Sequence, residues 1–321
     1  AIMNSKTAIK YSASLLSAVE VNVAALADSA AIAIGFTAKP EGEKPVFDFP
    51  AHAVLVKKLE KLFEVDLRDE LAFFSATGKT GELFEIPVAS NQMQADRILL
   101  IGLGDATTAS LRLAGAALGR KGRGKATVIS SICVASPEQL QAFAISVQLG
   151  AYIWTQKTGA TQELPQFLFA TDKPEVIDDA SVIASAISRT RDLVHTPSNI
   201  KTPLWMADEA QKIALENGLE IKILAGKELA EFGGLCAVGN SSPKPGPRFV
   251  EVTYYPRGMK KNISALAHVV IVGKGITFDT GGISLKRPYE TMMAMKSDMA
   301  GSAAALGAIS ALNHFQPQVH V

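Results

Sequence analysis

Residues 269–286 read VVIVGKGITFDTGGISLK. The four apolar residues 269–272 have strand character, and a glycine-rich turn after a buried strand is typical of an α/β protein. Glycine lets the backbone approach a ligand closely, and Asp279 in this turn can bind a hard or borderline cation through its oxygens. A second acid, Asp298, follows in the sequence MKSDMAG at 295–301. The two acids predict a ligand site at the end of a strand.

The two segments resemble the signature of the cytosolic leucyl aminopeptidases, two-metal exopeptidases whose pattern is close to VGKGITFDSGGISLK followed by MKxDMxGAAA. A weaker similarity to the same family extends upstream to the segment RDLVHTPSN at 191–199, to Thr202-Pro203 and to the turn-rich residues 237–248. The resemblance covers residues 191–321, and the earlier part of the chain agrees with the family in general character.

The resemblance implies a role for each residue of the signature. Asp279 would bridge two metal ions and Asp298 would bind one of them. Lys274 would be a ligand through a neutral amine, because an adjacent cation disfavours the ammonium form. Lys286 would be the catalytic residue, a fixed cation that stabilises the oxyanion of the tetrahedral intermediate. Met295 would line the pocket for the first side chain of the substrate, where a flexible thioether suits varied apolar groups.

The implied activity is that of a metal-dependent aminopeptidase, which releases apolar, leucine-like residues from the amino termini of peptides. Two divalent ions in each subunit, Zn or Mn, would activate a water and polarise the peptide carbonyl. The resemblance further implies a homohexamer that works in the cytoplasm. From Lys286 to Asp298 there are eleven intervening residues, 287 to 297, which is one more than the family pattern has.

The chain ends at Val321, before the family's NTDAEGRL motif, which carries two further metal ligands and an arginine. We therefore expect the chain to represent the amino-terminal domain and the first half of the catalytic domain. We also expect that it lacks part of the metal site and is inactive on its own.

Other catalytic motifs fit the sequence poorly. Gly78-Lys79-Thr80 looks like the end of a P-loop, but Phe73 stands where the first glycine is required. The sequence has no His-Glu-x-x-His and no Gly-x-Ser-x-Gly, which excludes a zincin protease and an α/β-hydrolase elbow. His195 and His268 flank the signature segments, but they are not placed in the site. We interpret His268 as a residue of the core.

Composition limits the alternative functions. The 321 residues are 48% hydrophobic and 20% charged with a net charge of +1, which indicates a globular protein with little attraction for nucleic acid. The principal alternative is a non-catalytic scaffold or a DNA-associated role, and the near-neutral charge speaks against it. The basic cluster 120–125 could contact phosphate, but we interpret it as a solvated loop after a helix. A dinuclear phosphoesterase is a third possibility, disfavoured because clustered histidines are missing.

Targeting and redox signals are weak in this sequence. The uncharged runs 139–156 and 299–321 are too polar or too broken to predict a membrane span. Cys133 and Cys236 are far apart and form no Cys-x-x-Cys pair, which suits a reducing compartment. The sequence therefore predicts neither a membrane partner nor a disulfide framework.

Alternating strand and helix patterns predict two α/β domains, 1–172 and 173–321, each with a mixed or mostly parallel sheet flanked by helices. In the first domain the expected strands are 31–36, 84–89, 98–101, 126–134 and 167–170, and the expected helices are 50–63, 110–118 and 138–155. Pro87 restricts its strand to an edge of the sheet. In the second domain the expected helices are 179–195, 207–217, 227–232 and 291–313, and the expected strands are 220–224, 248–255 and 267–272.

Overall fold

The structure is a computed structural model that describes residues 9–11, 30–41, 44–50, 52–89, 95–125, 127–130, 132, 136–158, 165–242 and 244–321. It divides into two compact units, Ala1–Ser185 and Ala186–Val321, and the division falls within helix α6 (Pro174–His195). The sequence-based boundary at 172/173 remains a prediction. Residues 126, 131, 133 and 134 of one predicted strand, including Cys133, lie outside the described residues.

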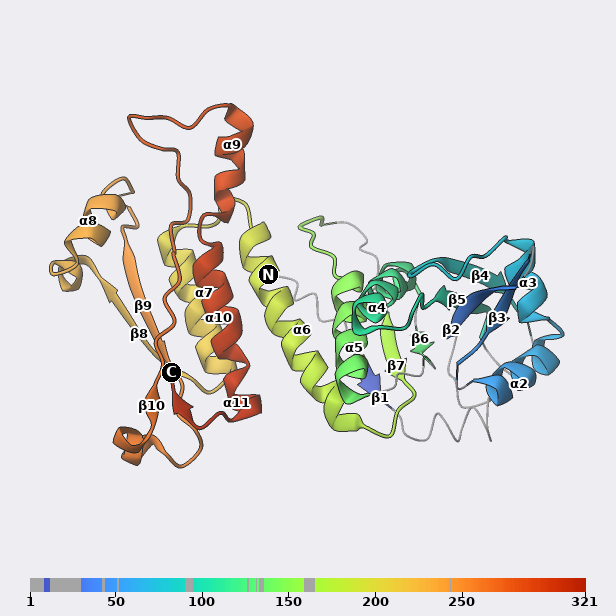
Figure 1. Cartoon of the computed structure of the whole chain (residues 1–321). Helices are drawn as coiled ribbons and strands as arrows, with labels where there is room; N and C mark the ends of the chain where they lie inside the picture. Colours follow the sequence, from blue (N-terminus) through green and yellow to red (C-terminus); the bar gives the residue numbers. More distant parts are fainter. Residues whose placement is uncertain are drawn as a thin grey trace. The chain divides into compact units, whose positions relative to one another are not determined.

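Unit 1 contains a seven-stranded sheet in the order β1-β7-β6-β2-β5-β4, with β3 paired to β2 (Figure 1). Strands β1, β7, β6, β2 and β5 are parallel neighbours, whereas β3 and β4 are antiparallel to their partners. The strands are β1 (Ile9–Tyr11), β2 (Ala30–Glu41), β3 (Lys44–Asp48), β4 (Leu83–Pro87), β5 (Arg97–Gly102), β6 (Thr127–Ser130) and β7 (Gln166–Phe169). The mostly parallel sheet is as predicted, and Pro87 lies in the edge strand β4.

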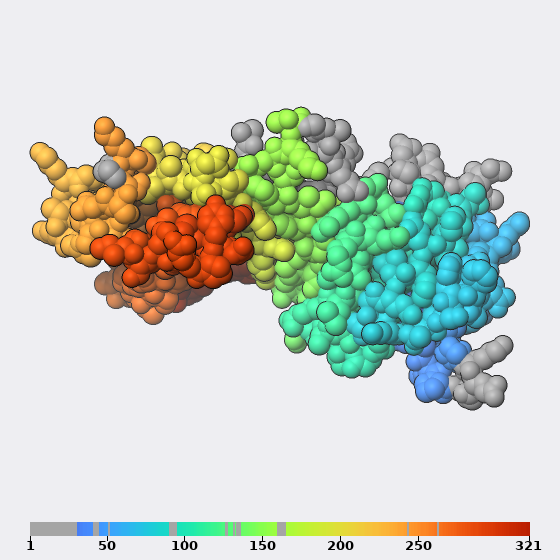
Figure 2. All heavy atoms as spheres, turned by 90° about the horizontal axis from the view of Figure 1, so that it is seen from above, coloured from blue at the N-terminus to red at the C-terminus, as the bar shows by residue number. Residues whose placement is uncertain are grey.

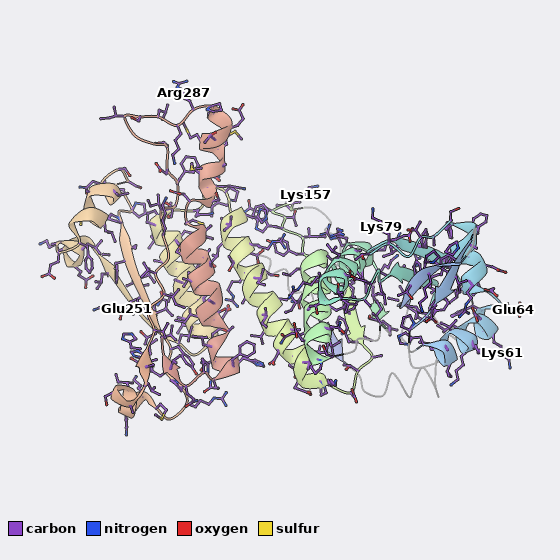
Figure 3. All side chains as sticks on the ribbon, viewed as in Figure 1. Lys61, Glu64, Lys79, Lys157, Glu251 and Arg287 are labelled. Atoms are coloured by element: carbon purple, nitrogen blue, oxygen red, sulfur yellow. The ribbon has the colours of Figure 1, made fainter. Side chains whose placement is uncertain are left out.

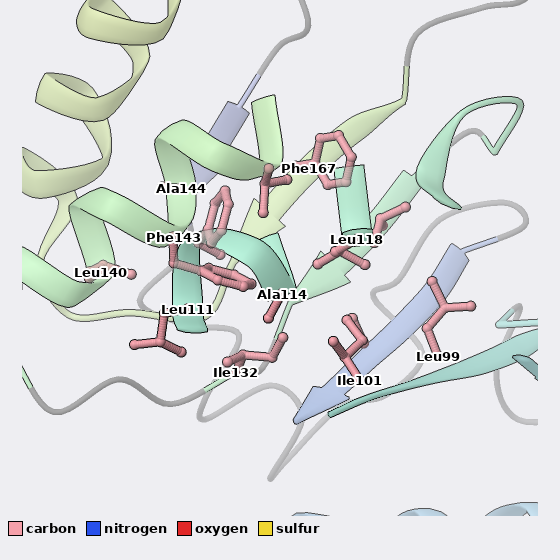
Figure 4. Packing of buried hydrophobic residues seen from close by; sticks show 14 of the residues in the cluster. Leu99, Ile101, Leu111, Ala114, Leu118, Ile132, Leu140, Phe143, Ala144 and Phe167 are labelled. Atoms are coloured by element: carbon pink, nitrogen blue, oxygen red, sulfur yellow. The ribbon is translucent and has the colours of Figure 1, made fainter. Parts of the chain in front are cut away.

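Successive residues of the central strands face opposite layers of unit 1. Ile32 and Ile34 of β2 belong to a buried cluster with α2 and α3, while Ala31 and Ala33 belong to another with α4 and α5. Figure 4 shows the second cluster, in which Phe143 of α5 lies among side chains of α4 and the sheet. A parallel sheet buried on both faces explains the near-continuous apolar sequence of these strands. The helices are α2 (Ala53–Phe63), α3 (Leu67–Phe73), α4 (Thr108–Gly122) and α5 (Pro137–Ala151).

Helices α4 and α5 touch through glycine. A Cβ atom on Gly119 would lie 2.0 Å from the carbonyl oxygen of Val147, and one on Gly115 would lie 2.7 Å from that of Phe143. The amino termini of both helices are capped by side-chain oxygens, since Thr107 accepts from the Ser110 amide and Ser136 from the Gln139 amide. Local capping and small residues thus fix this layer of the unit.

Unit 2 packs helices against two small sheets. Strands β8 and β9 are antiparallel, and β10 and β11 are parallel. Helix α10 lies beside α7 (Figures 1 and 2), and Met299 and Leu306 share a buried cluster with Met206 and Ile213. The elements are α7 (Pro203–Glu216), β8 (Glu220–Ala225), η2 (Gly226–Leu229), α8 (Gly233–Gly239), β9 (Arg248–Thr253), η3 (Lys260–Ala265), β10 (Ala267–His268), α9 (Tyr289–Met293), η4 (Ala294–Ser297), α10 (Ala300–Ser310), α11 (Leu312–Phe315) and β11 (Val319–His320).

Several predictions for this unit were wrong in detail. The strand expected at 267–272 is paired at 267–268, and the side chains of Val270 and Val272 are 70% and 90% exposed. His268 is exposed rather than buried, and its ring stacks on that of His320 at 4.3 Å. In place of the helix expected at 227–232 the structure has the short 3-10 helix η2 (Gly226–Leu229), and α8 begins only at Gly233.

The helix expected at 291–313 is divided into α9, η4, α10 and α11. Its sequence is rich in alanine, methionine and glycine with little polar periodicity, so periodicity could not locate the break. The break is at η4, where the carbonyl of Lys296 accepts a hydrogen bond from a side chain instead of from the next helical turn. It sets the position of Asp298, which lies between η4 and α10.

Candidate functional site

The five residues implied by the signature lie on two neighbouring stretches of unit 2. Lys274, Asp279 and Lys286 belong to the irregular loop that follows β10, and Met295 and Asp298 belong to η4 and to the residues that lead into α10. Arg287 marks the tip of this loop beside α9 in Figure 3. We call residues 269–288 the site loop.

A close backbone approach holds the start of the site loop against α10. A Cβ on Gly273 would lie 2.5 Å from the Cα of Ser302, so a larger residue does not fit there. The Ser302 amide donates to the carbonyl of Lys274 at 2.9 Å. The Lys274 ammonium then lies 2.6 Å from Oδ1 of Asp298, in a first ion pair of the site.

A tight turn holds the second ion pair. Gly281 adopts φ of +94°, and its amide donates to Oδ1 of Asp279 at 2.8 Å. The Lys286 amide donates to the carbonyl of Thr280, which brings the Lys286 ammonium to 2.8 Å from Oδ2 of Asp279. The same ammonium donates to the sulfur of Met295 at 3.0 Å. Lys286 therefore joins the predicted metal ligand Asp279 to the predicted pocket residue.

The electrostatics of the site favour an ionised Asp279. The hydrogen bond from Lys286 and that from the Gly281 amide lower the pKa of the Asp279 carboxyl below its usual value. Lys274 also contributes to this lowering of the pKa, although it is bonded to Asp298. The structure thus brings four of the residues together as two ion pairs, with Met295 in contact with Lys286. The convergence of Lys274, Asp279 and Asp298 on a single point stays a prediction.

The carboxylate oxygens and the amine nitrogen of this site are atom types that can bind a divalent cation. Oδ2 of Asp298 is buried and has no hydrogen-bond partner among the described residues, an arrangement that costs free energy unless a cation or water binds there. Each of the two carboxylates forms an ion pair with an ammonium group. Within the described ranges no group of three His, Cys, Asp or Glu side chains could hold a metal ion. Two carboxylates and the Lys274 amine suit a metal but are fewer than a closed site uses.

One further residue of this region was missed by the sequence analysis. Lys201, in the loop between α6 and α7, is 2% exposed, and its ammonium donates to the carbonyl of Lys296 at 2.7 Å. A lysine in a polar segment before Thr202-Pro203 gives no sequence signal of burial. Its contact with η4 depends on residues far away in the sequence.

The structure also explains two motifs that the site does not use. The Thr77 and Gly78 amides donate to the carboxylate of Glu82, so these amides are not free to bind a phosphate.

In the basic cluster 120–125, Lys121 and Lys125 form ion pairs with Glu85. Burial alone would raise the pKa of Glu85, but hydrogen bonds from Lys121, Lys125 and Arg97 outweigh it and lower the pKa to about 2.

Arg123 of the same cluster donates to the carbonyls of Gly150 and Tyr152 at the end of α5. Three of the cluster's cations are therefore bound within unit 1, which weakens the case for a nucleic-acid surface. Separately, no helix of the described chain is both long and apolar enough to cross a membrane.

Comparison with known proteins agrees with these observations. A model of the catalytic domain of the cytosol aminopeptidase family matches residues 188–321, and a model of the family's amino-terminal domain matches residues 46–156. The chain is similar to a probable cytosol aminopeptidase of Solibacter usitatus, with 34% identity over 295 residues, 87% of this chain and 60% of that protein. It is also similar to one of Exiguobacterium sibiricum, with 35% identity over 254 residues, 76% of this chain and 51% of that protein.

The chain is also similar to two solved structures. The bottromycin maturation enzyme BotP in complex with Mn aligns with a TM-score of 0.70 and 29% identity, covering 92% of this chain and 58% of that chain. A mutant of tomato leucine aminopeptidase aligns with a TM-score of 0.74 and 22% identity, covering 98% and 61%, and shows likeness of fold alone. The chain spans 51% to 60% of the length of the two curated relatives above.

Proposed function

Because the chain belongs to the cytosol aminopeptidase family, we propose that the whole protein is a metal-dependent aminopeptidase that releases apolar, leucine-like residues from the amino termini of peptides. The observation that carries this proposal is the pairing of Lys274 with Asp298 and of Asp279 with Lys286 in one neighbourhood. Two ion pairs beside a buried, unpartnered carboxylate oxygen, Oδ2 of Asp298, are typical of a functional site.

Two divalent ions, Zn or Mn, are the cofactors in this proposal, held by Asp279, Asp298 and the neutral amine of Lys274. The unpartnered Oδ2 of Asp298 supports a cation at this position, and the Mn in the BotP complex supports the choice of metal. When bound, the ions would activate a water and polarise the peptide carbonyl. Further ligands are needed to complete the site, so the 321 residues are expected to be inactive by themselves.

The chain's own residues would orient the substrate and stabilise charge. Lys286 is 28% exposed in its side chain and contacts both Asp279 and Met295. A fixed ammonium that contacts both Asp279 and Met295 would stabilise the oxyanion that develops on the scissile carbonyl. Met295 would contact the first side chain of the substrate, and its flexible thioether would accept several apolar shapes.

The assembly and location are also proposals. We place the whole protein in the cytoplasm as a homohexamer that acts on peptides. The alternative scaffold or DNA-associated role has less support, because Lys121, Arg123 and Lys125 are engaged within unit 1.

The decisive experiment is hydrolysis of a leucyl chromogenic amide by the whole protein. Release of leucine should require Mn²⁺ or Zn²⁺, should stop when a chelator is added, and should return when the metal is restored. A glycyl or aspartyl amide is the control for side-chain preference and should be cleaved more slowly. Release that is absent with every metal tested would end the aminopeptidase proposal.

A further inference from the structure

Lys201 is a buried ammonium group whose acceptors are two carbonyls and a thioether. It is 2% exposed and lies in the connection between α6 and α7. Its Nζ atom donates to the carbonyl of Val194 at 3.0 Å, to the carbonyl of Lys296 at 2.7 Å and to the sulfur of Met299 at 3.3 Å. An ammonium has three hydrogens, so these three acceptors can use all of them.

Burial makes the charged form of Lys201 less favourable than it is in water. Burial, with a smaller contribution from the nearby Lys296 cation, lowers the pKa of Lys201 to about 8. The ammonium form still dominates at neutral pH, and it is the form that can donate three hydrogen bonds. No carboxylate of the described residues neutralises this buried charge, so its role is sought in what its hydrogen bonds hold together.

The first acceptor is at the end of a helix. Val194 lies in the last turn of α6, where the final carbonyls lack partners within the helix and a cation is favoured by the helix dipole. The backbone of Lys201 is itself fixed, because its amide donates to the carbonyl of Pro197, and the next residue, Thr202, caps α7. The ammonium is therefore presented from a rigid loop.

The second acceptor lies in η4. Lys296 returns a contact to the same helix end, since its ammonium donates to the carbonyl of His195 at 3.2 Å. Two lysines thus join η4 to the end of α6, Lys201 from the loop after α6 and Lys296 from η4 itself. η4 contains Met295, and the amide of Asp298 donates to the Met295 carbonyl. Any movement of η4 would move both site residues.

We propose that Lys201 is a positioning residue: its buried ammonium clamps η4 to the end of α6 and so holds Asp298 and Met295 toward the site loop. The clamp itself is independent of the reaction, whereas its importance for metal and substrate rests on the proposed function. The proposal explains why a long cation, and not an apolar side chain, fills this space: backbone carbonyls of two elements converge on it.

Hydrogen exchange of the metal-free protein tests the clamp directly. In Lys201→Met, the amides of residues 295–300 should exchange about tenfold faster than in the wild type, because local opening no longer breaks two hydrogen bonds. Leu219→Ala is the matched control: Leu219 is buried in a different cluster of unit 2, so its loss should reduce stability without a selective effect on 295–300. Equal exchange of this segment in Lys201→Met and wild type would overturn the proposal.

A binding measurement tests the consequence for the site. Calorimetric titration of the whole protein with Mn²⁺ should give an affinity about tenfold weaker in Lys201→Met and unchanged in Leu219→Ala, as found for residues that orient metal ligands. Wild-type protein that binds no Mn²⁺ would refute the proposed function, while the exchange result would still decide on the clamp. Unchanged Mn²⁺ affinity in a Lys201→Met protein with faster exchange would overturn the positioning role.

A milder variant covers the case in which Lys201→Met does not fold. Met299→Leu keeps the buried volume and removes one of the three acceptors, so it should fold. Exchange of residues 295–300 should then rise by a few-fold, in the same direction as in Lys201→Met. An exchange rate equal to that of the wild type in this variant would contradict the clamp.

Discussion

The central sheet of unit 1 and the site loop of unit 2 are stabilised in opposite ways. In the sheet, strands such as β5 are buried on both faces, and Leu99 and Leu100 are both 0% exposed although they point to different layers. In the site loop, Val270 and Val272 are exposed, and order comes from glycine-dependent turns and two ion pairs. Both regions contain runs of apolar residues, but the run in β5 is buried and the run at the start of the site loop is exposed.

The difference separates the source of stability from the arrangement of charge. Burial of apolar area is strong and non-directional, so it determines whether unit 1 folds. The contacts of the site loop are few, polar and dependent on direction, so they contribute little to stability and much to the arrangement of charge. Variants in the two regions should therefore separate the two properties.

The largest effect on stability is expected from the core of unit 1. Phe143 is fully buried between α4 and the sheet, and its ring meets that of Phe169 edge-on at 6.1 Å. Phe143→Ala should lower the free energy of unfolding by about 3–5 kcal/mol, through lost burial and the cavity left behind. Urea denaturation followed by circular dichroism measures it. Leu113→Ala, on the exposed face of α4, is the control and should change the free energy by less than about 0.5 kcal/mol.

The site loop should show the reverse behaviour. In the whole protein, Lys286→Ala should keep Mn²⁺ bound and reduce kcat by about 100-fold or more, because a fixed cation for the oxyanion is lost. Asp279→Ala should abolish Mn²⁺ binding. Both variants should unfold at nearly the wild-type urea concentration, since these side chains are partly exposed.

The exposed Lys222 of β8 provides a matched control for the loss of a lysine, and Lys222→Ala should keep both metal and turnover. Near-normal turnover in Lys286→Ala would show that the oxyanion role is wrong. A large loss of stability in Lys286→Ala would instead remove the contrast between the two regions.

The smallest effect concerns the pH dependence of stability at Lys201. The folded pKa of Lys201 is about 8, below the ordinary value of 10.5, so the unfolded chain binds more protons between these pH values. The free energy of unfolding of the wild type, relative to Lys201→Met, should therefore rise as pH increases from 8 toward 10. The expected rise is on the order of 1–2 kcal/mol, measured by urea denaturation at several pH values. A difference that is flat with pH, or that falls, would contradict the burial of a charged Lys201.

The sequence allowed much of unit 1 to be predicted. Strands β2, β5 and β7 lie where apolar runs were found, and α4 and α5 overlap the helices expected at 110–118 and 138–155. The signature likewise led to Lys274, Asp279, Lys286, Met295 and Asp298, which the structure brings into one neighbourhood. The fold of unit 2 was less predictable, because 291–313 has no periodicity that marks its break and 267–272 looks the same whether it is buried or exposed.

Local sequence determined the α/β class, the apolar strands and the residue types of the site, because these depend on short-range propensity, on alternation and on the chemistry of single side chains. Tertiary structure alone decided which charges meet, that Lys286 joins Asp279 to Met295, and that Lys201 reaches η4 from a loop 95 residues earlier. Such contacts join segments far apart in the chain. Their free energy exists only once the backbone around them has folded.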